Sequence, residues 1–359
     1  MASFVAILIP QNRQFLMPPK DKSKLTIYDV AQHAGVAIST VSRVLNDSPD
    51  VSERTREKVE QAIDDLKYHP NRTARSLAQQ EFHSIAVALP SFTAPFQNEL
   101  LKGIRAYMRT AGLDLLICDL GSSDLSSSLR SFLERGSVRG MIICELPLDA
   151  ELAADLIGMH SGTVLIGNTW KDFDSFTWND QSGIQLAVEH LVEQGHEYIC
   201  MIRSAEDSDM QLHRLQGYRA GLQAAGLPFV ESRLVAGNPR YHGGFSEEDG
   251  YDAMKTILRQ HPEATAVVTS SDVQAIGAIA ALNEARISVP KQMAIVGCDD
   301  IKTSRFIGLS SVDLSMQKIG YAAAERLHVR MNNGFQTPEQ IVVEPKLHVR
   351  NSSDFKRNK

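Results

Sequence analysis

The spacing of apolar residues changes near residue 84, and the two patterns predict two kinds of structure. From about Lys24 to Gln80, apolar residues recur at helical spacing in short segments. Beyond this point, longer amphipathic stretches alternate with short apolar runs at 85–89, 113–118, 140–144, 163–167, 198–202, 266–270 and 293–298. Strands separated by helices predict parallel sheets covered on both faces. These strands are too many for one sheet, so we expect an α/β core of two doubly wound lobes with a ligand cleft between them.

The all-α N-terminal segment has the pattern of a helix-turn-helix. Thr26 can cap a first helix, and Gly35 stands where a left-handed residue would end it. Val41 and Val44 then lie on the apolar face of a second short helix. Its opposite face carries side chains suited to base edges in the major groove: Ile38, Ser39, Ser42 and Arg43. The alternative is a helical hairpin in a bundle, with those side chains merely solvated.

A third helix and a short basic segment follow. Ser52 can cap the third helix, whose apolar face includes Val59 and Leu66. After Pro70 comes a segment too short and too polar to form a stable helix alone, and it carries arginines and Leu77. An apolar side chain flanked by arginines can wedge into the minor groove and kink DNA. The alternative is a plain linker with a stray leucine.

Charge at first argues against a nucleic-acid partner. The composition, 43% hydrophobic and 22% charged, is that of a globular protein, and the formal net charge is −6. Between residues 24 and 80, however, eight Lys and Arg residues balance eight Asp and Glu residues. DNA affinity must therefore come from the placement of a few arginines and from dimerisation, rather than from bulk charge.

The N-terminal residues and the cysteines indicate the cellular compartment in which we expect the protein. No apolar run is long enough to span a membrane, and residues 1–23 have neither a basic start nor a small-residue cleavage site. We expect a disordered leader there, or a start at Met17, rather than a signal peptide. The four cysteines stand in apolar runs without metal-ligand spacing: Cys118, Cys144, Cys200 and Cys298. Buried free thiols suit a reducing cytoplasm, where a DNA-binding protein would associate with the nucleoid.

The sequence resembles the LacI/GalR family of bacterial transcriptional regulators over about residues 24–350. TIYDVAQHAGVAISTVSRVLNDSPDVSERTREKVEQAIDDLKYHPNRTARSLA is similar to the family's headpiece and hinge. ELLKGI, DQSG, EHLVEQGH, RLQGY and IVGCDD are similar to its type I periplasmic-binding-protein-like core. The resemblance implies a leader (1–23), a helix-turn-helix domain (24–69), a hinge helix (70–82) and a two-lobed effector-binding and dimerisation domain (83–355).

The family further implies a homodimeric repressor that reads a palindromic operator and is controlled by a sugar-like effector. Its DNA-binding positions correspond to Thr26, Ile38, Ser39, Thr40, Ser42, Arg43, Asn46, Asn71, Arg72, Ala74, Arg75 and Leu77. Its effector-binding positions correspond to Phe92, Phe96, Gln97, Asn168, Trp170, Arg214, Ser271, Asp272 and Asp299. An arginine and a carboxylate can bind vicinal hydroxyls, and an aromatic ring can stack on a sugar.

Four positions depart from the family pattern. Ala37 stands where a serine usually caps the recognition helix, and Gln97 stands where a second aromatic residue is usual. Ser271 replaces a common asparagine before Asp272, and Cys298 replaces an aromatic residue before Asp299. We expect the architecture to be unchanged and the pocket to differ.

Two other classes of protein are less consistent with the sequence. A solute-binding protein would show a signal peptide and no DNA-binding module. An enzyme would need a catalytic motif, and no G-x-S-x-G, H-E-x-x-H, P-loop or G-x-G-x-x-G is present. The acids at 247–249 suggest a metal site or, with Ser246 before them, the first turn of a helix, which we favour. His190 and His196 are expected to be structural, so we predict no catalytic residue, metal or cofactor.

Overall fold

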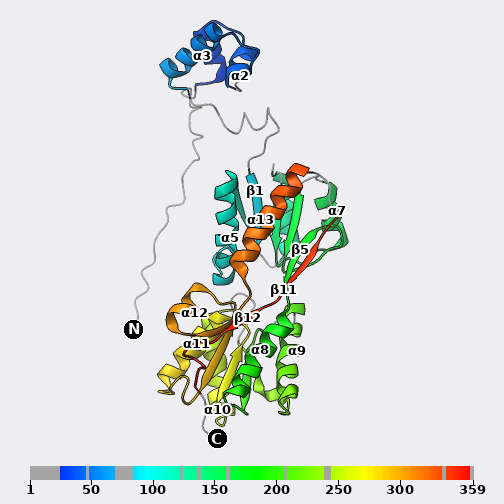
Figure 1. Ribbon diagram of the computed structural model, residues 1–359, viewed down its shortest axis with the longest axis vertical. Helices are drawn as coiled ribbons and strands as arrows, with labels where there is room; N and C mark the ends of the chain where they lie inside the picture. Colours follow the sequence, from blue (N-terminus) through cyan, green and yellow to red (C-terminus); the bar gives the residue numbers. More distant parts are fainter. Residues whose placement is uncertain are drawn as a thin grey trace, which may run out of the picture. The chain divides into compact units, whose positions relative to one another are not determined.

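The chain divides into two compact units, Met1–Glu81 and Phe82–Lys359 (Figure 1). The computed structural model describes residues 25–45, 48–68, 84–121, 124–135, 138, 140–158, 162–205, 208–237, 244–333 and 337–355. The predictions of a disordered leader over residues 1–23 and of a hinge helix over residues 70–82 lie outside these described residues. Within them, no helix is both long and apolar enough to cross a membrane.

The N-terminal unit is a three-helix domain of α1 (Ile27–Ala34), α2 (Ile38–Leu45) and α3 (Glu53–Leu66). Its core is formed by small apolar side chains that are at most 5% exposed: Val30, Ala31, Val41, Val44, Val59 and Ala62. Gly35 ends α1 with φ +65°, a left-handed conformation that disfavours residues with a Cβ. The tight turn that was predicted between α1 and α2 is therefore present.

Local side-chain bonds fix the start of α1. The Asp29 carboxylate accepts hydrogen bonds from the backbone nitrogen and the hydroxyl of Thr26, both at 2.7 Å. These bonds lower the pKa of Asp29, because they stabilise its ionised form. Ser52 occupies the N-cap position of α3 as predicted, but its hydroxyl bonds the Thr55 hydroxyl at 2.8 Å instead of a backbone amide.

The C-terminal unit contains two α/β lobes. Lobe 1 has a parallel sheet with strand order β11-β5-β4-β3-β1-β2 among the described residues. Its elements are β1 (Ser84–Leu89), α5 (Pro95–Ala111), β2 (Asp114–Asp119), α6 (Leu125–Arg135), β3 (Gly140–Cys144), α7 (Ala150–Gly158), β4 (Gly162–Ile166), β5 (Asp174–Trp178), α13 (Met316–Asn333) and β11 (Gln340–Val343). The lobe is therefore completed by a helix and a strand from the end of the chain (Figure 1).

Lobe 2 has the strand order β12-β10-β9-β8-β6-β7, in which β12 is antiparallel to β10. Its elements are α8 (Asp180–Glu193), β6 (Ile199–Arg203), α9 (Asp209–Ala224), the 3₁₀ helix η1 (Glu231–Arg233), β7 (Leu234–Ala236), α10 (Glu247–Gln260), β8 (Ala266–Thr269), α11 (Asp272–Glu284), β9 (Ala294–Cys298), α12 (Lys302–Ile307), β10 (Ser310–Asp313) and β12 (Lys346–His348). The two doubly wound lobes were predicted, and the four cysteines, all within the described residues, are buried thiols outside any disulfide, as expected.

Helix pairs in both lobes pack with backbone in direct contact. A Cβ on Gly103 of α5 would lie 1.9 Å from the Gln317 carbonyl oxygen of α13, and one on Gly277 of α11 would lie 1.8 Å from the Glu247 carbonyl oxygen of α10. Only glycine permits such an approach. Each helix pair is thus held at a separation that no larger residue would allow.

Candidate functional site

The outward face of α2 presents the side chains that were predicted to read DNA. Ile38 is 41% exposed, and Ser39 and Arg43 are also exposed, while Val41 and Val44 on the opposite face are buried. Thr40 and Ser42 are half-buried, and Thr26 is exposed at the start of α1. The other predicted DNA contacts lie outside the described residues: Asn46, Asn71, Arg72, Ala74, Arg75 and Leu77.

A second candidate site lies where the carboxyl ends of strands in the two lobes meet. On the side of lobe 1, Gln97 is in the first turn of α5 and Glu145 directly follows β3. Gln97 Nε2 donates a hydrogen bond of 2.8 Å to Glu145 Oε2. Burial raises the pKa of Glu145, while this bond and the charge of Arg214 in lobe 2 oppose the increase.

On the side of lobe 2, Arg214 of α9 forms a buried ion pair. Its Nε donates to Asp180 Oδ1 at 2.9 Å, and the two side chains are 3% and 9% exposed. Its Nη1 donates to the carbonyl oxygen of Ser270, which follows β8. Two of the five donors of the guanidinium are therefore used within lobe 2, and the others can serve a ligand.

Asp299 follows β9 and adds a second carboxyl group to the site. Burial raises the pKa of Asp299 well above its usual value, as do the charges of Asp272 and Glu145, and Arg214 opposes them. Asp299 has φ 116° and Glu145 has φ 52°, conformations that are unfavourable for residues other than glycine. Backbone strain of this kind clusters at binding sites, because the surrounding structure has to maintain it.

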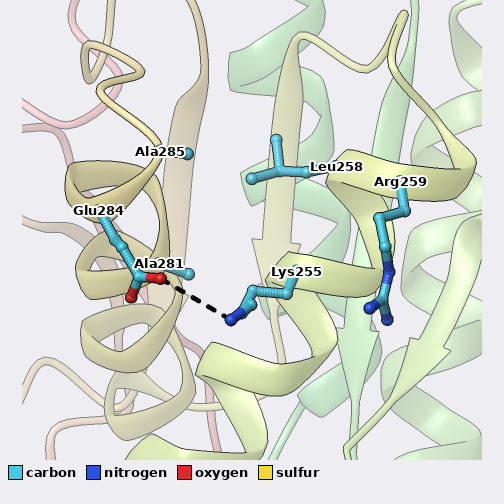
Figure 2. A pocket seen from close by; sticks show the side chains of 6 residues that line it. All are labelled: Lys255, Leu258, Arg259, Ala281, Glu284 and Ala285. Carbon is cyan, nitrogen blue, oxygen red and sulfur yellow. Dashed lines mark ion pairs between the residues drawn. The ribbon is translucent and has the colours of Figure 1, made fainter.

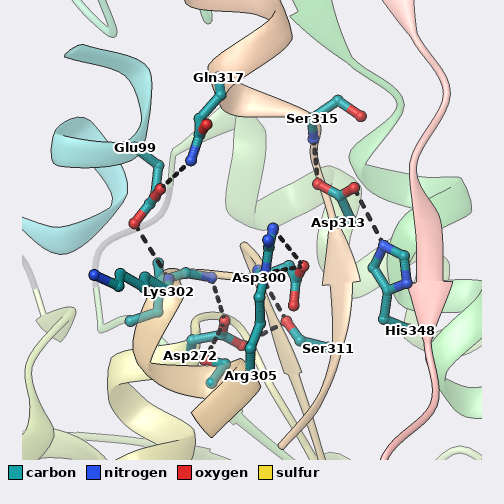
Figure 3. Close-up of polar contacts among 12 residues, drawn as sticks. Glu99, Asp272, Asp300, Lys302, Arg305, Ser311, Asp313, Ser315, Gln317 and His348 are labelled. Atoms are coloured by element: carbon teal, nitrogen blue, oxygen red, sulfur yellow. Dashed lines mark hydrogen bonds and ion pairs between the residues drawn. The ribbon is translucent and has the colours of Figure 1, made fainter. Parts of the chain in front are cut away.

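Asp272, which was predicted to bind the effector, fixes the loop after β9 (Figure 3). Its Oδ2 accepts bonds from the Ile301 nitrogen at 2.9 Å and the Ser304 hydroxyl at 2.7 Å. Its Oδ1 accepts a bond of 2.6 Å from the Ser311 hydroxyl. Burial raises the pKa of Asp272 to about 7, although these bonds favour the ionised form. Ser271, the N-cap of α11, accepts a bond from the Gln274 nitrogen at 3.4 Å.

Glu99 joins the two lobes beside this loop (Figure 3). Although Glu99 belongs to α5 of lobe 1, it accepts a 3.2 Å hydrogen bond from the backbone nitrogen of Lys302 at the start of α12 in lobe 2. It also accepts bonds from Gln317 at 2.7 Å and Lys102 at 2.5 Å. Burial opposes ionisation, but these bonds hold the pKa of Glu99 below its usual value. Glu99 therefore couples the position of α12 to lobe 1.

The other predicted effector-binding residues lie in different surroundings. The Phe96 ring packs edge-on against Trp178, with ring centroids 5.6 Å apart. Phe92 is 46% exposed, and Asn168 is half-buried just beyond β4. Trp170 packs against the apolar cluster of lobe 1 that includes Leu152 and Phe173. The structure thus brings Gln97, Arg214 and Asp299 into one electrostatic group, and it places Trp170 with a hydrophobic core.

Sequence reasoning missed Glu145 and Asp180. Each had a local signal, since Glu145 immediately follows the apolar run at 140–144 and Asp180 begins the DQSG segment. The alternatives raised for other acids and histidines have structural explanations. Ser246 accepts a bond from the Asp249 nitrogen at 3.1 Å, and His190 and His196 bond the hydroxyls of Ser353 and Thr265 at 2.8 and 3.0 Å.

Two further clusters of charged residues are already paired internally. Between α10 and α11 there is an open pocket in which Lys255 and Glu284 form a 3.8 Å ion pair (Figure 2). In the described part of the chain, Asp300, Asp313 and His348 have a spacing that could hold a metal ion. The Asp300 carboxylate, however, pairs with Arg305 at 3.1 Å and with Arg350 at 2.6 Å. A cation there would compete with two guanidinium groups.

Comparisons with known proteins match both units. The model "Bacterial regulatory proteins, lacI family" matches residues 26–71, and "Periplasmic binding protein-like domain" matches residues 188–353. The HTH-type transcriptional repressor PurR of Yersinia pestis (strain Pestoides F) is 31% identical over 338 residues, which cover 91% of this chain and 96% of that protein. The ribose operon repressor of Escherichia coli (strain K12) is 29% identical over 336 residues, covering 91% and 99%.

Solved structures of transcriptional regulators also match this chain. The lac repressor dimer bound to operator and the anti-inducer ONPF matches with a TM-score of 0.77 and 26% identity, over 92% of this chain and 99% of that one. The complex of the transcriptional regulator CelR with cellobiose matches with a TM-score of 0.66 and 28% identity, over 91% and 99%. The curated relatives are transcriptional repressors, which identifies a regulator rather than an enzyme. The chain belongs to the lacI family of bacterial regulatory proteins.

Proposed function

We propose that this protein is a repressor that binds a palindromic operator as a homodimer in the bacterial cytoplasm, at the nucleoid, under the control of a small molecule bound between the lobes. In this proposal residues 24–69 read DNA, residues 70–82 form a hinge helix, and residues 83–355 bind the effector and dimerise. The observation that carries it is the exposed face of α2, where Ile38, Ser39 and Arg43 are free of the core.

Base reading is proposed for α2 because its two faces have separate roles. Val41 and Val44 anchor the helix in the domain, so the opposite face can enter the major groove. Arg43 can donate two hydrogen bonds to guanine, and Ser39 and Ile38 can contact base edges or a thymine methyl. We propose phosphate, base or minor-groove contacts for the remaining predicted residues, and Leu77 as the wedge of the hinge helix.

Effector binding is proposed for the site between the lobes. The likenesses to a ribose operon repressor and to a regulator bound to cellobiose favour a sugar-like molecule. The donors of Arg214 and the carboxyl groups of Glu145 and Asp299 can bind vicinal hydroxyls, with Phe96 beside them. Effector binding would change the angle between the lobes and thereby the affinity for DNA, a coupling of about 1–3 kcal/mol.

The test of DNA recognition compares a substitution on the proposed base-reading face of α2 with a control substitution on α3. An operator is first selected from random DNA with the full chain, and affinities for it and for a scrambled duplex are measured at fixed salt. Arg43→Ala should weaken operator binding by about 1–3 kcal/mol and relax specificity at one base pair. Lys58→Ala removes the same charge from the exposed surface of α3 and should affect both duplexes alike. Equal losses on both duplexes for Arg43→Ala would contradict base reading.

The hinge is tested with Leu77→Ala. This variant should bind a stabilising effector as the unsubstituted protein does, since Leu77 lies before the core, but it should bind the operator more weakly. An unchanged operator affinity would contradict the wedge. Effector control itself is tested by titrating the operator with and without a small molecule that raises the melting temperature.

A further inference from the structure

The site between the lobes has more carboxyl groups than cations. Arg214 is already paired with Asp180, at 2.9 Å. Glu145 from lobe 1 and Asp299 from lobe 2 remain, and among the described residues Arg214 is the cation whose charge acts on both. Glu145 accepts a hydrogen bond from Gln97 and Asp299 accepts one from the backbone of Asp272, but neither has a cation of its own. Burying a carboxylate without a dedicated countercharge is unfavourable, and two such groups near each other increase the cost.

An unused acceptor lies beside these carboxyl groups. The Gln97 side chain is 6% exposed, and its Nε2 donates to Glu145, which is the orientation that an ionised carboxylate requires because it can only accept hydrogen bonds. Its Oε1 is thereby fixed in orientation, and it has no hydrogen-bond partner in the described structure. A buried amide oxygen without a donor is costly, so it indicates a ligand group that donates.

From these observations we infer that the effector carries a protonated primary amine on a polyhydroxylated skeleton, and that Glu145, Asp299 and Gln97 Oε1 hold the amine. This inference rests on the proposed function of the site and narrows its ligand class. An ammonium group has three N–H donors and one positive charge. It would supply a donor to each of the three acceptors, whereas a hydroxyl supplies one donor and no charge.

A metal ion fits these groups less well. The groups of three His, Cys, Asp or Glu side chains with metal-ligand spacing in the described residues do not include Glu145 or Asp299. The remaining N–H groups of Arg214 can bind hydroxyls of the same molecule. An amino sugar or amino polyol would therefore use both the acidic and the basic part of the site.

The test compares matched pairs that differ only in the amine: glucose with glucosamine, galactose with galactosamine, and sorbitol with 1-amino-1-deoxysorbitol. Melting temperatures of the full chain identify the skeleton that stabilises it, and calorimetry then measures the dissociation constants of that pair. The dissociation constant of the amine should be lower than that of its neutral counterpart by a factor of about ten or more, because charge-assisted hydrogen bonds are stronger than neutral ones.

Two substitutions assign the discrimination to these residues. Glu145→Gln and, separately, Asp299→Asn should abolish the preference for the amine. Each unliganded variant should melt no lower than the original protein, because a buried acid without a cation of its own becomes neutral while an acceptor oxygen remains for its hydrogen-bond donor. Glu151→Gln, at an acid whose side chain is 80% exposed on α7, should leave the preference unchanged.

Three results would overturn the inference. They are stabilisation by none of the amines, equal affinity for both members of a pair, and a preference for the amine that persists in both Glu145→Gln and Asp299→Asn. If a neutral sugar binds and releases or recruits operator DNA, the proposed function stands, and only the inference that the effector carries an amine is refuted. Failure to select an operator would instead count against the proposed function.

Discussion

Replacing Arg214 with methionine should reveal how much the core depends on its buried ion pair. The substitution leaves the Asp180 carboxylate, 9% exposed, without its partner at 2.9 Å, and it removes a donor from the Ser270 carbonyl oxygen. Breaking a buried pair from one side costs about 3–5 kcal/mol, because a charge stays buried without compensation. Asp180→Asn should cost less, since Arg214 still interacts with the charges of Glu145 and Asp299.

The measurement is urea unfolding of the core at pH 7, followed by circular dichroism. The double variant Arg214→Met/Asp180→Asn should be more stable than the sum of the single losses predicts, by about 0.5–3 kcal/mol. Arg219→Met is the control, because Arg219 lies on the same helix with half of its side chain exposed and a 3.9 Å ion pair to Glu231. A surface change of this kind should stay within about 1 kcal/mol. Additive losses, or equal losses for Arg214→Met and Arg219→Met, would refute this account of the pair.

Two further substitutions test other parts of the core. Gly277→Ala should destabilise it by about 1–3 kcal/mol in urea unfolding, because the new Cβ would lie 1.8 Å from the Glu247 carbonyl oxygen, whereas Gly158→Ala, with nothing within 4 Å, should not. Wild-type stability of Gly277→Ala would rule out the close approach. The pKa of Asp272 is about 7 when folded and near 3.8 when unfolded, so this residue lowers stability as pH rises from about 4 to about 7. Asp272→Asn should flatten that dependence in melting curves, and a steeper one would contradict the raised pKa.

The sequence predicts the N-terminal unit and the strands with continuous apolar runs better than the remaining strands of the two sheets. Thr26 and Gly35 are local signals, and their effect does not depend on the rest of the chain. By contrast, β5, β7, β10, β11 and β12 were missed because they are short and carry little apolar periodicity. In β10, Ser310 and Ser311 are fully buried, and their hydroxyls bond Arg350 and Asp272. From sequence alone, two adjacent serines are typical of a turn, because their long-range hydrogen-bond partners are not visible there.

The candidate effector site was predicted in part for a similar reason. Arg214 and Asp299 could be assigned because they stand in motifs of the family. The role of Glu145 depends on the approach of two lobes whose strands are far apart in sequence, and no spacing along the chain indicates that its charge reaches Arg214. Trp170, which was assigned to the effector site by its position in the sequence, is partly buried and packs against the hydrophobic cluster of lobe 1, and its contact with the effector stays a prediction.

The return of α13 and β11 to lobe 1 has a consequence for how the protein is made. The ribosome completes β1 to β5 first, then lobe 2 from α8 to β10, and only afterwards the helix that covers the first sheet, followed by β11 and by β12 of lobe 2. Until α13 emerges, the surface that Gly140 and Gly162 present to Leu327 has no cover. Exposed apolar surface on a growing chain invites aggregation and chaperone binding. The lobe whose synthesis begins first therefore stays incomplete while the ribosome makes most of the other lobe, and its open sheet is the part of the nascent core that most needs protection.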